Sequence, residues 1–126
     1  MITGLHHVLL AAPPGSEDLM RGFYSGVLGL TETAKPERLV ARGGVWFTGP
    51  GLNLHIGIED PFQPARKAHP GILVADLDAL AGDLTAAGYQ TVPDDLLEIP
   101  GGETYRRFYV SDPVRNRLEF LQLRLI

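Results

Sequence analysis

Four side chains in this sequence could bind a transition metal together: His7, His55, His69 and Glu119. The chain contains no cysteine, so such a site must be built from imidazole and carboxylate groups. Two imidazoles and a carboxylate suit divalent Fe, Mn, Co, Ni or Zn and can leave coordination positions open for a substrate. An ion with open positions can polarise a carbonyl, stabilise an enolate or clamp two neighbouring oxygens. The residue types therefore predict one divalent metal ion acting on a small molecule.

A repeat places these residues at equivalent points of the chain. The stretch 67–78 restarts the pattern of the N-terminus, because in both places a histidine opens a short apolar run that leads into a helical pattern. Each half reads as a strand, a helix and three further strands. We therefore expect an α+β fold of two βαβββ modules, with curved mixed sheets around a cavity. Module one covers about residues 1–58, a linker about 59–68, and module two about 69–126.

Strand alternation decides which faces the four residues occupy. In the strand 52–58 the even-numbered apolar residues share the core face, so His55 points away from the helix. His7 and Glu119 have the same cavity-side parity, whereas His6 should point toward the helix and is interpreted as structural. A single strand histidine is more often a hydrogen-bonded structural residue, and Glu119 alone could be solvated. A metal site is favoured because all four residues lie on cavity-side faces at equivalent points of the repeat. Of the four, His55 fits the repeat least well.

Periodicity and turn residues predict the remaining elements. Two amphipathic helices are expected, one after the N-cap Ser16 and ending before Gly29, the other after the N-cap Asp76 and ending before Gly88. Short apolar or alternating runs bounded by Gly and Pro predict the strands. The helices cover 16–28 and 77–87, and the strands cover 5–12, 30–33 running toward 39–41, 44–48, 52–58, 69–75, 89–92 with 96–99 as an extension, 105–110 and 117–123.

The bulk properties exclude several classes of partner. A length of 126 residues with 44% hydrophobic and 21% charged residues fits one globular domain. The net charge of −4 gives no general attraction to nucleic acid or to anionic membrane surfaces. The N-terminus lacks the pattern of a signal peptide, and no apolar run approaches the length of a membrane span. We expect a cytoplasmic protein.

Several segments together resemble the vicinal oxygen chelate superfamily. This superfamily includes glyoxalase I, fosfomycin-resistance thiol transferases, extradiol dioxygenases, methylmalonyl-CoA epimerase and bleomycin-binding proteins. The resemblance covers nearly the whole chain and is specific for the superfamily, but not for a reaction. The segments are 4–8 (GLHHV), 23–30 (FYSGVLGL), His69 with its strand, 76–80 (DLDAL), and 108–113 (FYVSDP) leading to 116–120 (NRLEF).

The resemblance implies roles for individual residues. His7, His69 and Glu119 match the usual metal ligands, and His55 stands where glyoxalase-like members place a glutamate. His55 could therefore be a fourth ligand or a proton-transfer base. Tyr109 matches a tyrosine near the substrate in the fosfomycin enzymes.

The resemblance also implies an assembly and argues against one substrate. Members with one such unit per chain commonly form homodimers, so His7 and His55 would come from one chain and His69 and Glu119 from the other. Leu9 stands where the fosfomycin enzymes present a hydroxyl group to the phosphonate, which disfavours fosfomycin modification.

Two further residues are candidates for substrate binding. Arg117 shares the parity of Glu119 and could steer an anionic substrate. Trp46 and Phe47 alternate, so one of them should line the cavity while the other packs under the helix.

The sequence is compatible with two functions. The first is a metal-dependent enzyme, with lyase or isomerase chemistry ahead of dioxygenase chemistry. The alternative is a metal-free protein of the bleomycin-resistance type that sequesters a drug. The ligand set favours the enzyme, because a sequestering protein does not need it.

Overall fold

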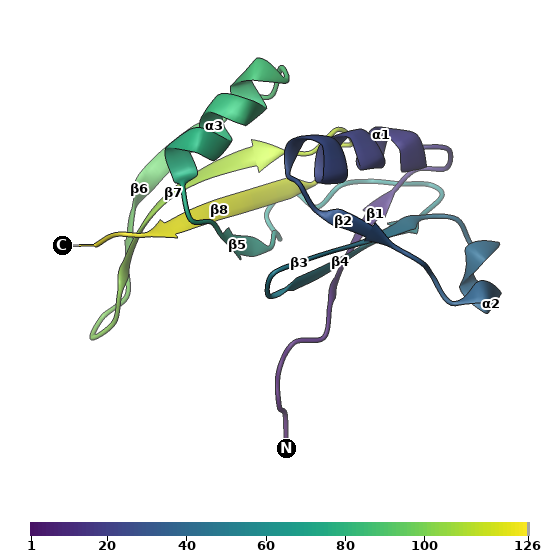
Figure 1. The fold of residues 1–126 in the computed structure, drawn as a ribbon, viewed down its shortest axis with the longest axis horizontal. Helices are drawn as coiled ribbons and strands as arrows, with labels where there is room; N and C mark the ends of the chain where they lie inside the picture. Colours follow the sequence, from purple (N-terminus) through teal and green to yellow (C-terminus); the bar gives the residue numbers. More distant parts are fainter. Residues whose placement is uncertain (126) are drawn as a thin grey trace. The chain divides into compact units, whose positions relative to one another are not determined.

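The computed structural model describes residues 1–125, which form two compact units (Figure 1). The first unit is Met1–Pro64 and the second begins at Ala65. Each unit contains a four-stranded mixed sheet with a helix that follows its first strand, in the order β-α-β-β-β. The expected α+β architecture of two βαβββ modules is therefore confirmed. Among the described residues, no helix is both long and apolar enough to cross a membrane.

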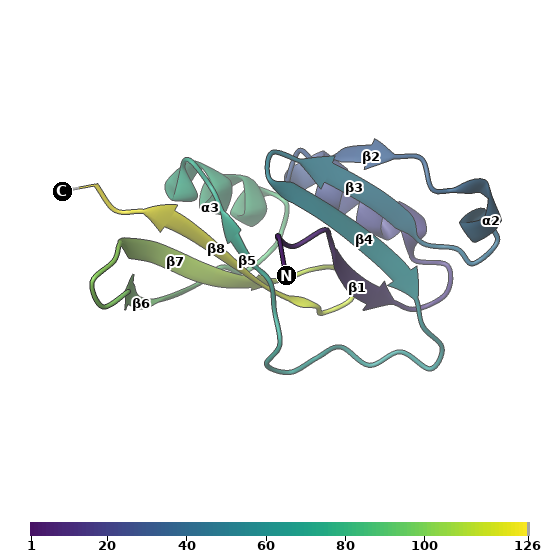
Figure 2. The same ribbon diagram turned by 90° about the horizontal axis from the view of Figure 1, so that it is seen from below.

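The sheet of unit one has the strand order β1-β4-β3-β2. The strands are β1 (Val8–Ala12), β2 (Thr31–Thr33), β3 (Val45–Gly49) and β4 (Leu52–Ile58). β1 pairs with β4 in parallel, and the other neighbours are antiparallel. Figure 2 shows β1 beside β4 at one edge of this sheet. The N-terminal strand is shorter than the expected 5–12, so both adjacent histidines precede it.

The helix of unit one changes its winding midway. α1 (Glu17–Arg21) continues directly into a π-helical segment, η1 (Gly22–Val27), where the Leu28 N–H donates to the carbonyl oxygen of Phe23 five residues earlier at 2.9 Å. The expected span 16–28 is thus correct in extent, although its second half is wider than an α-helix. Its buried side chains are Met20, Phe23 and Tyr24, and the Tyr24 ring packs against Phe47 of the sheet with centroids 5.5 Å apart. By alternation along the strands, the buried Leu54 and Ile56 lie on the same face as Phe47.

The expected strand at 39–41 is wrong. The chain forms a short helix there, α2 (Glu37–Val40), and Val40 is 60% exposed. Pro36 precedes this helix with φ of −52°, close to the helical value, and residues 37–39 are good helix formers. Without a neighbouring strand or a buried face, local propensity decides the conformation of this segment.

Unit two repeats the arrangement with the strand order β5-β8-β7-β6. The strands are β5 (Gly71–Leu73), β6 (Val92–Glu98), β7 (Thr104–Ser111) and β8 (Arg117–Leu123). The two expected pieces at 89–92 and 96–99 belong to one strand, because β6 passes over a register shift between Asp94 and Leu97. A bulge of this kind breaks the alternation on which the sequence prediction depends.

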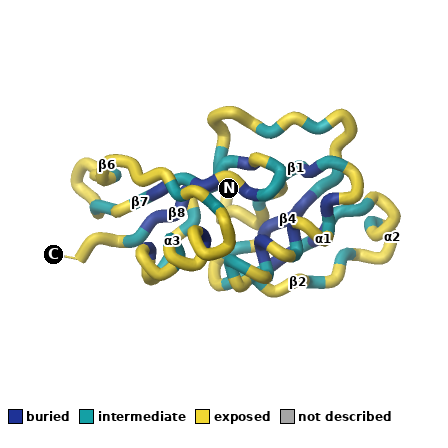
Figure 3. The backbone as a smooth tube through the Cα atoms, turned by 90° about the horizontal axis from the view of Figure 1, so that it is seen from above, coloured by how far each residue is buried: buried dark blue, intermediate teal, exposed yellow. Residues whose placement is uncertain are grey.

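The helix of unit two has the expected caps. α3 (Leu77–Ala86) begins after Asp76, whose side chain accepts a hydrogen bond from the Ala79 N–H at 3.0 Å. It ends at Gly88, which has φ of +91°, and the Tyr89 N–H returns to the Leu84 carbonyl. Figure 3 shows that buried residues are concentrated along β4, β7 and β8, which contribute to the cores of the two units. The core of unit two consists of Leu77, Leu84, Phe108, Val110, Leu118 and Phe120 with Leu121.

Candidate functional site

In unit one, three aromatic rings are stacked on the face of the sheet opposite the helix. His55 on β4 is directly opposite Trp46 on β3, and their ring centroids lie 3.8 Å apart with planes only 3° from parallel. The His7 ring stacks on His55 at 4.2 Å and 15°. Strand pairing places Trp46 opposite His55, and the segment that leads into β1 adds His7 to the stack. Phe47, the neighbour of Trp46, packs against Tyr24 on the helix side, as the alternation predicts.

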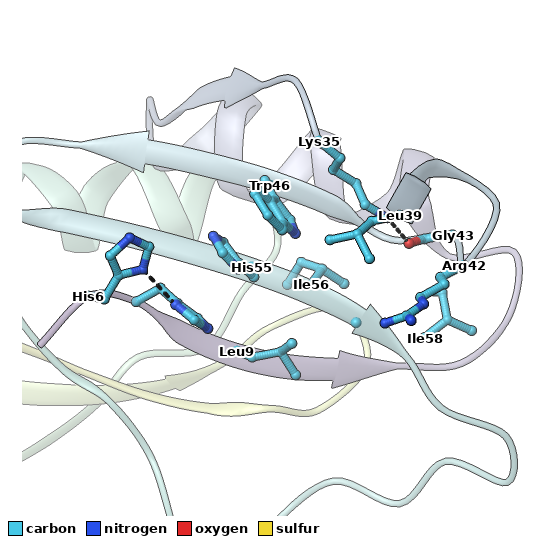
Figure 4. Close-up of a pocket in the computed structure, with 12 residues that line it drawn as sticks. His6, Leu9, Lys35, Leu39, Arg42, Gly43, Trp46, His55, Ile56 and Ile58 are labelled. Carbon is cyan, nitrogen blue, oxygen red and sulfur yellow. Dashed lines mark hydrogen bonds between the residues drawn. The ribbon is translucent and has the colours of Figure 1, made fainter. Parts of the chain in front are cut away.

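The rings line a pocket of about 430 Å³, shown in Figure 4. This volume is in the range of small-molecule sites. Its lining residues come from the N-terminal segment, the α2 region and strands β1, β3 and β4. They are His6, His7, Leu9, Lys35, Leu39, Arg42, Gly43, Trp46, His55, Ile56, Gly57 and Ile58.

His6 belongs to this pocket, contrary to its interpretation as a structural residue on the helix side. Its Nδ1 lies 2.9 Å from Nδ1 of His7, so one of the two rings donates a hydrogen bond to the other. If His7 donates, its Nε2 is left without a proton and is free to bind a metal. The sequence signal was present in the adjacent pair of histidines. The alternation argument failed because both residues precede β1, where the period of two does not hold.

His55 is only 7% exposed between its two ring neighbours. Burial lowers the pKa of its imidazole, and electrostatic repulsion of a proton on this ring by His7 and then by His6 lowers the pKa further. The ring is therefore neutral at neutral pH. A neutral imidazole is the form that binds a metal or accepts a proton.

In unit two, Glu119 is the centre of a polar cluster on the sheet face opposite α3. It lies on β8 directly opposite Tyr109 on β7 and is 7% exposed. Its Oε1 lies 3.1 Å from Nε2 of His69, and its Oε2 accepts a hydrogen bond from Arg107 Nη1 at 3.1 Å. His69 precedes β5 and does not lie within it, but the expected proximity of His69 and Glu119 is present.

The tautomer of His69 follows from its other contact. Nδ1 lies 2.7 Å from the backbone carbonyl oxygen of Lys67, which can only accept, so Nδ1 carries a proton. In the neutral ring Nε2 then presents a lone pair toward a carboxylate oxygen. Two lone-pair atoms at 3.1 Å repel each other unless a cation, either a proton or a metal ion, lies between them.

Two arginines interact with Tyr109. Arg107 Nη1 donates to the Tyr109 hydroxyl at 3.1 Å as well as to Glu119, and the Glu119 hydrogen bond is the main cause that raises the pKa of Arg107. The guanidinium of Arg117 lies 4.1 Å from the centroid of the Tyr109 ring, in a cation–π contact. Arg117 was predicted from the sequence as a substrate-binding residue, whereas the contact of Arg107 with the Glu119 carboxylate was not. The parity of Arg107, shared with Tyr109 on β7, is the signal that could have identified it.

Each unit thus contains two of the four predicted ligands: His7 with His55 in unit one, and His69 with Glu119 in unit two. The described residues contain no group of three or more His, Asp or Glu side chains placed to hold a metal ion. Each pair is therefore half of the predicted ligand set.

Comparison with known proteins places this arrangement in a family. No family sequence model matches the chain, and no curated protein matches it. Among solved structures, a glyoxalase family protein from Bacillus anthracis is 40% identical, with 98% of each chain covered and a TM-score of 0.89.

Two less similar structures share the fold. The fosfomycin resistance protein FosX from Listeria monocytogenes is 20% identical, covering 99% of this chain and 97% of its own, with a TM-score of 0.71. An integron cassette protein from the mobile metagenome of Vibrio cholerae ("V. Cholerae") is 18% identical, covering 97% and 96%, with a TM-score of 0.73. The chain belongs to the glyoxalase family, within the vicinal oxygen chelate superfamily.

Proposed function

We propose that this protein is a metal-dependent enzyme that acts on a small molecule with two neighbouring oxygens. His7, His69 and Glu119 would hold one divalent ion, and His55 would serve as a fourth ligand or as a base. When bound, the ion would supply Lewis-acid polarisation of the vicinal oxygens of the substrate. Lyase or isomerase chemistry fits this set best, and dioxygenase chemistry comes next.

The observation that carries the proposal is the pairing of His69 with Glu119. Because the Lys67 carbonyl accepts a hydrogen bond from Nδ1 of His69, the neutral ring faces the carboxylate with the lone pair of Nε2, and a metal ion would take the place of the proton that can join the two groups. A backbone carbonyl on the second ring nitrogen is the usual way in which proteins orient a metal-binding histidine. Two ligand atoms that are each about 2.1 Å from one ion lie about 3.0 Å apart at an octahedral angle and about 3.4 Å apart at a tetrahedral one. The separation of 3.1 Å between Nε2 and Oε1 lies between these two values.

His55 and Tyr109 are the candidates for proton transfer and substrate contact. The stacking of His55 between Trp46 and His7 fixes the plane of the ring, and its lowered pKa keeps the ring able to accept a proton. The hydroxyl of Tyr109 accepts a hydrogen bond from Arg107, so its own proton remains available for a substrate oxygen. Trp46 would provide a flat apolar wall for the substrate.

The division of the ligands between two units supports a homodimer. Each unit provides one pair of ligands, so two copies of the chain could complete two sites by combining unit one of each copy with unit two of the other. Light scattering tests this arrangement, and the mass of a single chain in solution would contradict it.

Metal analysis tests the enzyme directly. We expect the purified protein to bind one divalent ion per chain, and His69→Ala and Glu119→Ala each to lower the metal affinity at least tenfold, because each removes a ligand. Of the four histidines, His6 is the one outside the proposed set, but its ring is hydrogen-bonded to that of the proposed ligand His7, so His6→Ala should lower the metal affinity less than the loss of a ligand does. Glu98→Ala, on an exposed position of β6, is the control for the carboxylate.

The outcomes separate the enzyme from the alternative. A parent protein that takes up none of Fe, Mn, Co, Ni or Zn would contradict the enzyme and leave a drug-sequestering protein as the better reading. Unchanged metal affinity in both ligand variants would contradict the choice of ligands.

A further inference from the structure

We propose that the pocket of unit one binds an organic anion with an apolar body, whose oxyanion group lies against Lys35 and Arg42. This inference rests on the proposed function, since it names the class of substrate for the same site. The anionic group of the ligand would lie at the end of the pocket away from the histidines.

The two cations flank the short helix α2. Lys35 precedes it, and its Nζ donates a hydrogen bond to the backbone carbonyl of Gly43. Arg42 follows it, and the Arg42 N–H closes the turn to the Leu39 carbonyl at 3.1 Å. Figure 4 shows Lys35, Leu39 and Arg42 around one part of the pocket, while His6 lies at the other end. The helix that the sequence analysis did not anticipate therefore brings two positive groups to one cavity.

The charge of the pocket is one-sided. Its lining includes Lys35, Arg42 and three histidines but no aspartate or glutamate, although the whole chain has a net charge of −4. Glu17 touches the adjoining loop, where its Oε2 accepts the Gly44 N–H at 2.9 Å, but it does not line the pocket. Among the described residues, Arg42 has no ion pair or side-chain hydrogen bond, whereas Arg21 pairs with two carboxylates. Arg42 is exposed to solvent where it lines the pocket, and a cation there without a protein partner favours an anionic ligand.

The middle of the pocket is apolar. Leu9, which is paired with His55 and 57% exposed, lines it together with the ring of Trp46, which forms one wall (Figure 4). A ligand that fills this space would place oxygens near the histidines, an apolar segment against Leu9 and Trp46, and an oxyanion near Arg42. A small anion without an apolar body could contact only one of the two polar ends of the pocket.

Trp46 provides a direct readout, because it is the only tryptophan of the chain and lines the pocket. The probes are phenylacetate, 3-phenylpropionate and 4-phenylbutyrate, each compared with its neutral amide by titration of the tryptophan fluorescence. We expect the carboxylate to bind about tenfold more tightly than the amide for at least one chain length, since a hydrogen bond to a charged partner contributes about that much. Arg42→Gln and Lys35→Gln should remove the preference.

The matched control is Arg38→Gln. Arg38 lies on α2 between the two cations, is exposed and does not line the pocket, so this variant changes the net charge equally but should keep the preference. Equal binding, or no binding, of carboxylates and amides by the parent would overturn the inference. A preference that survives in both Arg42→Gln and Lys35→Gln would also overturn it.

Metal content of the parent distinguishes this inference from the proposed function. A parent that takes up metal but does not prefer carboxylates contradicts the anion site alone. A parent that prefers carboxylates through Arg42 but takes up no metal supports the anion site and contradicts the metal enzyme.

Discussion

Replacing Arg107 with methionine should destabilise the protein through the carboxylate of Glu119. Arg107 is 18% exposed at its side chain and Glu119 only 9%, so their hydrogen bond at 3.1 Å is poorly accessible to water. Methionine keeps much of the apolar volume of arginine but removes the charge and all donors. The Glu119 carboxylate then loses its strongest partner while it stays buried, which is the costly way to break an ion pair.

The expected cost follows from the contacts of Arg107. Its hydrogen bond to Glu119 is charge-assisted and should contribute about 2 kcal/mol, and the bond from Nε to the Asp95 carbonyl at 2.9 Å about 1 kcal/mol. The ion pair with Asp94 is largely exposed and adds little. We therefore expect Arg107→Met to lower the free energy of unfolding by about 3 kcal/mol.

A double-mutant cycle isolates the contribution of the ion pair. Urea unfolding of the parent, Arg107→Met, Glu119→Gln and the double variant, with a chelator present and at one protein concentration, should give a coupling energy of about 2 kcal/mol. The matched control is the adjacent Arg106, which pairs with Asp78 at 2.8 Å on an exposed surface. A second double-mutant cycle, with Arg106→Met and Asp78→Asn, should give a coupling energy close to zero, because solvent screens that pair. A coupling at Glu119 no larger than at Asp78 would refute the reasoning.

Two further predictions concern the loop that enters β3. Gly44→Ala should lower the free energy of unfolding by more than about 3 kcal/mol, because Gly44 has φ of +87° and an added Cβ would lie 2.1 Å from a backbone oxygen of β4. Gly51→Ala is the control for backbone strain alone, with φ of +66° and open space around the Cβ, and should cost about 1 kcal/mol in the same unfolding assay. The hydrogen bond from the Gly44 N–H is the main cause that lowers the pKa of Glu17 below 4.5, so Glu17 stabilises the fold above that pH and loses the effect as pH falls through its lowered pKa. The difference in stability between the parent and Glu17→Gln should therefore be full at pH 7 and shrink as the pH falls below 4.5 and through the lowered pKa of Glu17, and a constant difference would contradict this assignment.

The sequence determined the modules and the faces of their strands. Helical and strand periods are local properties, so the caps at Asp76 and Gly88 and the alternation in β4 and β8 were readable without tertiary information. That alternation placed His55 opposite the core and allowed one of Trp46 and Phe47 to line a cavity. Repetition of the pattern at His69 then identified the two pairs of candidate ligands.

Only the tertiary structure decided what those residues contact. The tautomer of His69 depends on its hydrogen bond to the Lys67 carbonyl. The carboxylate of Glu119 is held by a hydrogen bond from Arg107 on the neighbouring strand. Lys35 and Arg42 line the pocket because the helix α2 lies between them. His6 entered the pocket because the residues before β1 do not follow the strand period. Periodicity reports which side of an element a residue occupies. Hydrogen bonds and charge pairs require distances between elements, and these arise only when the strands are paired.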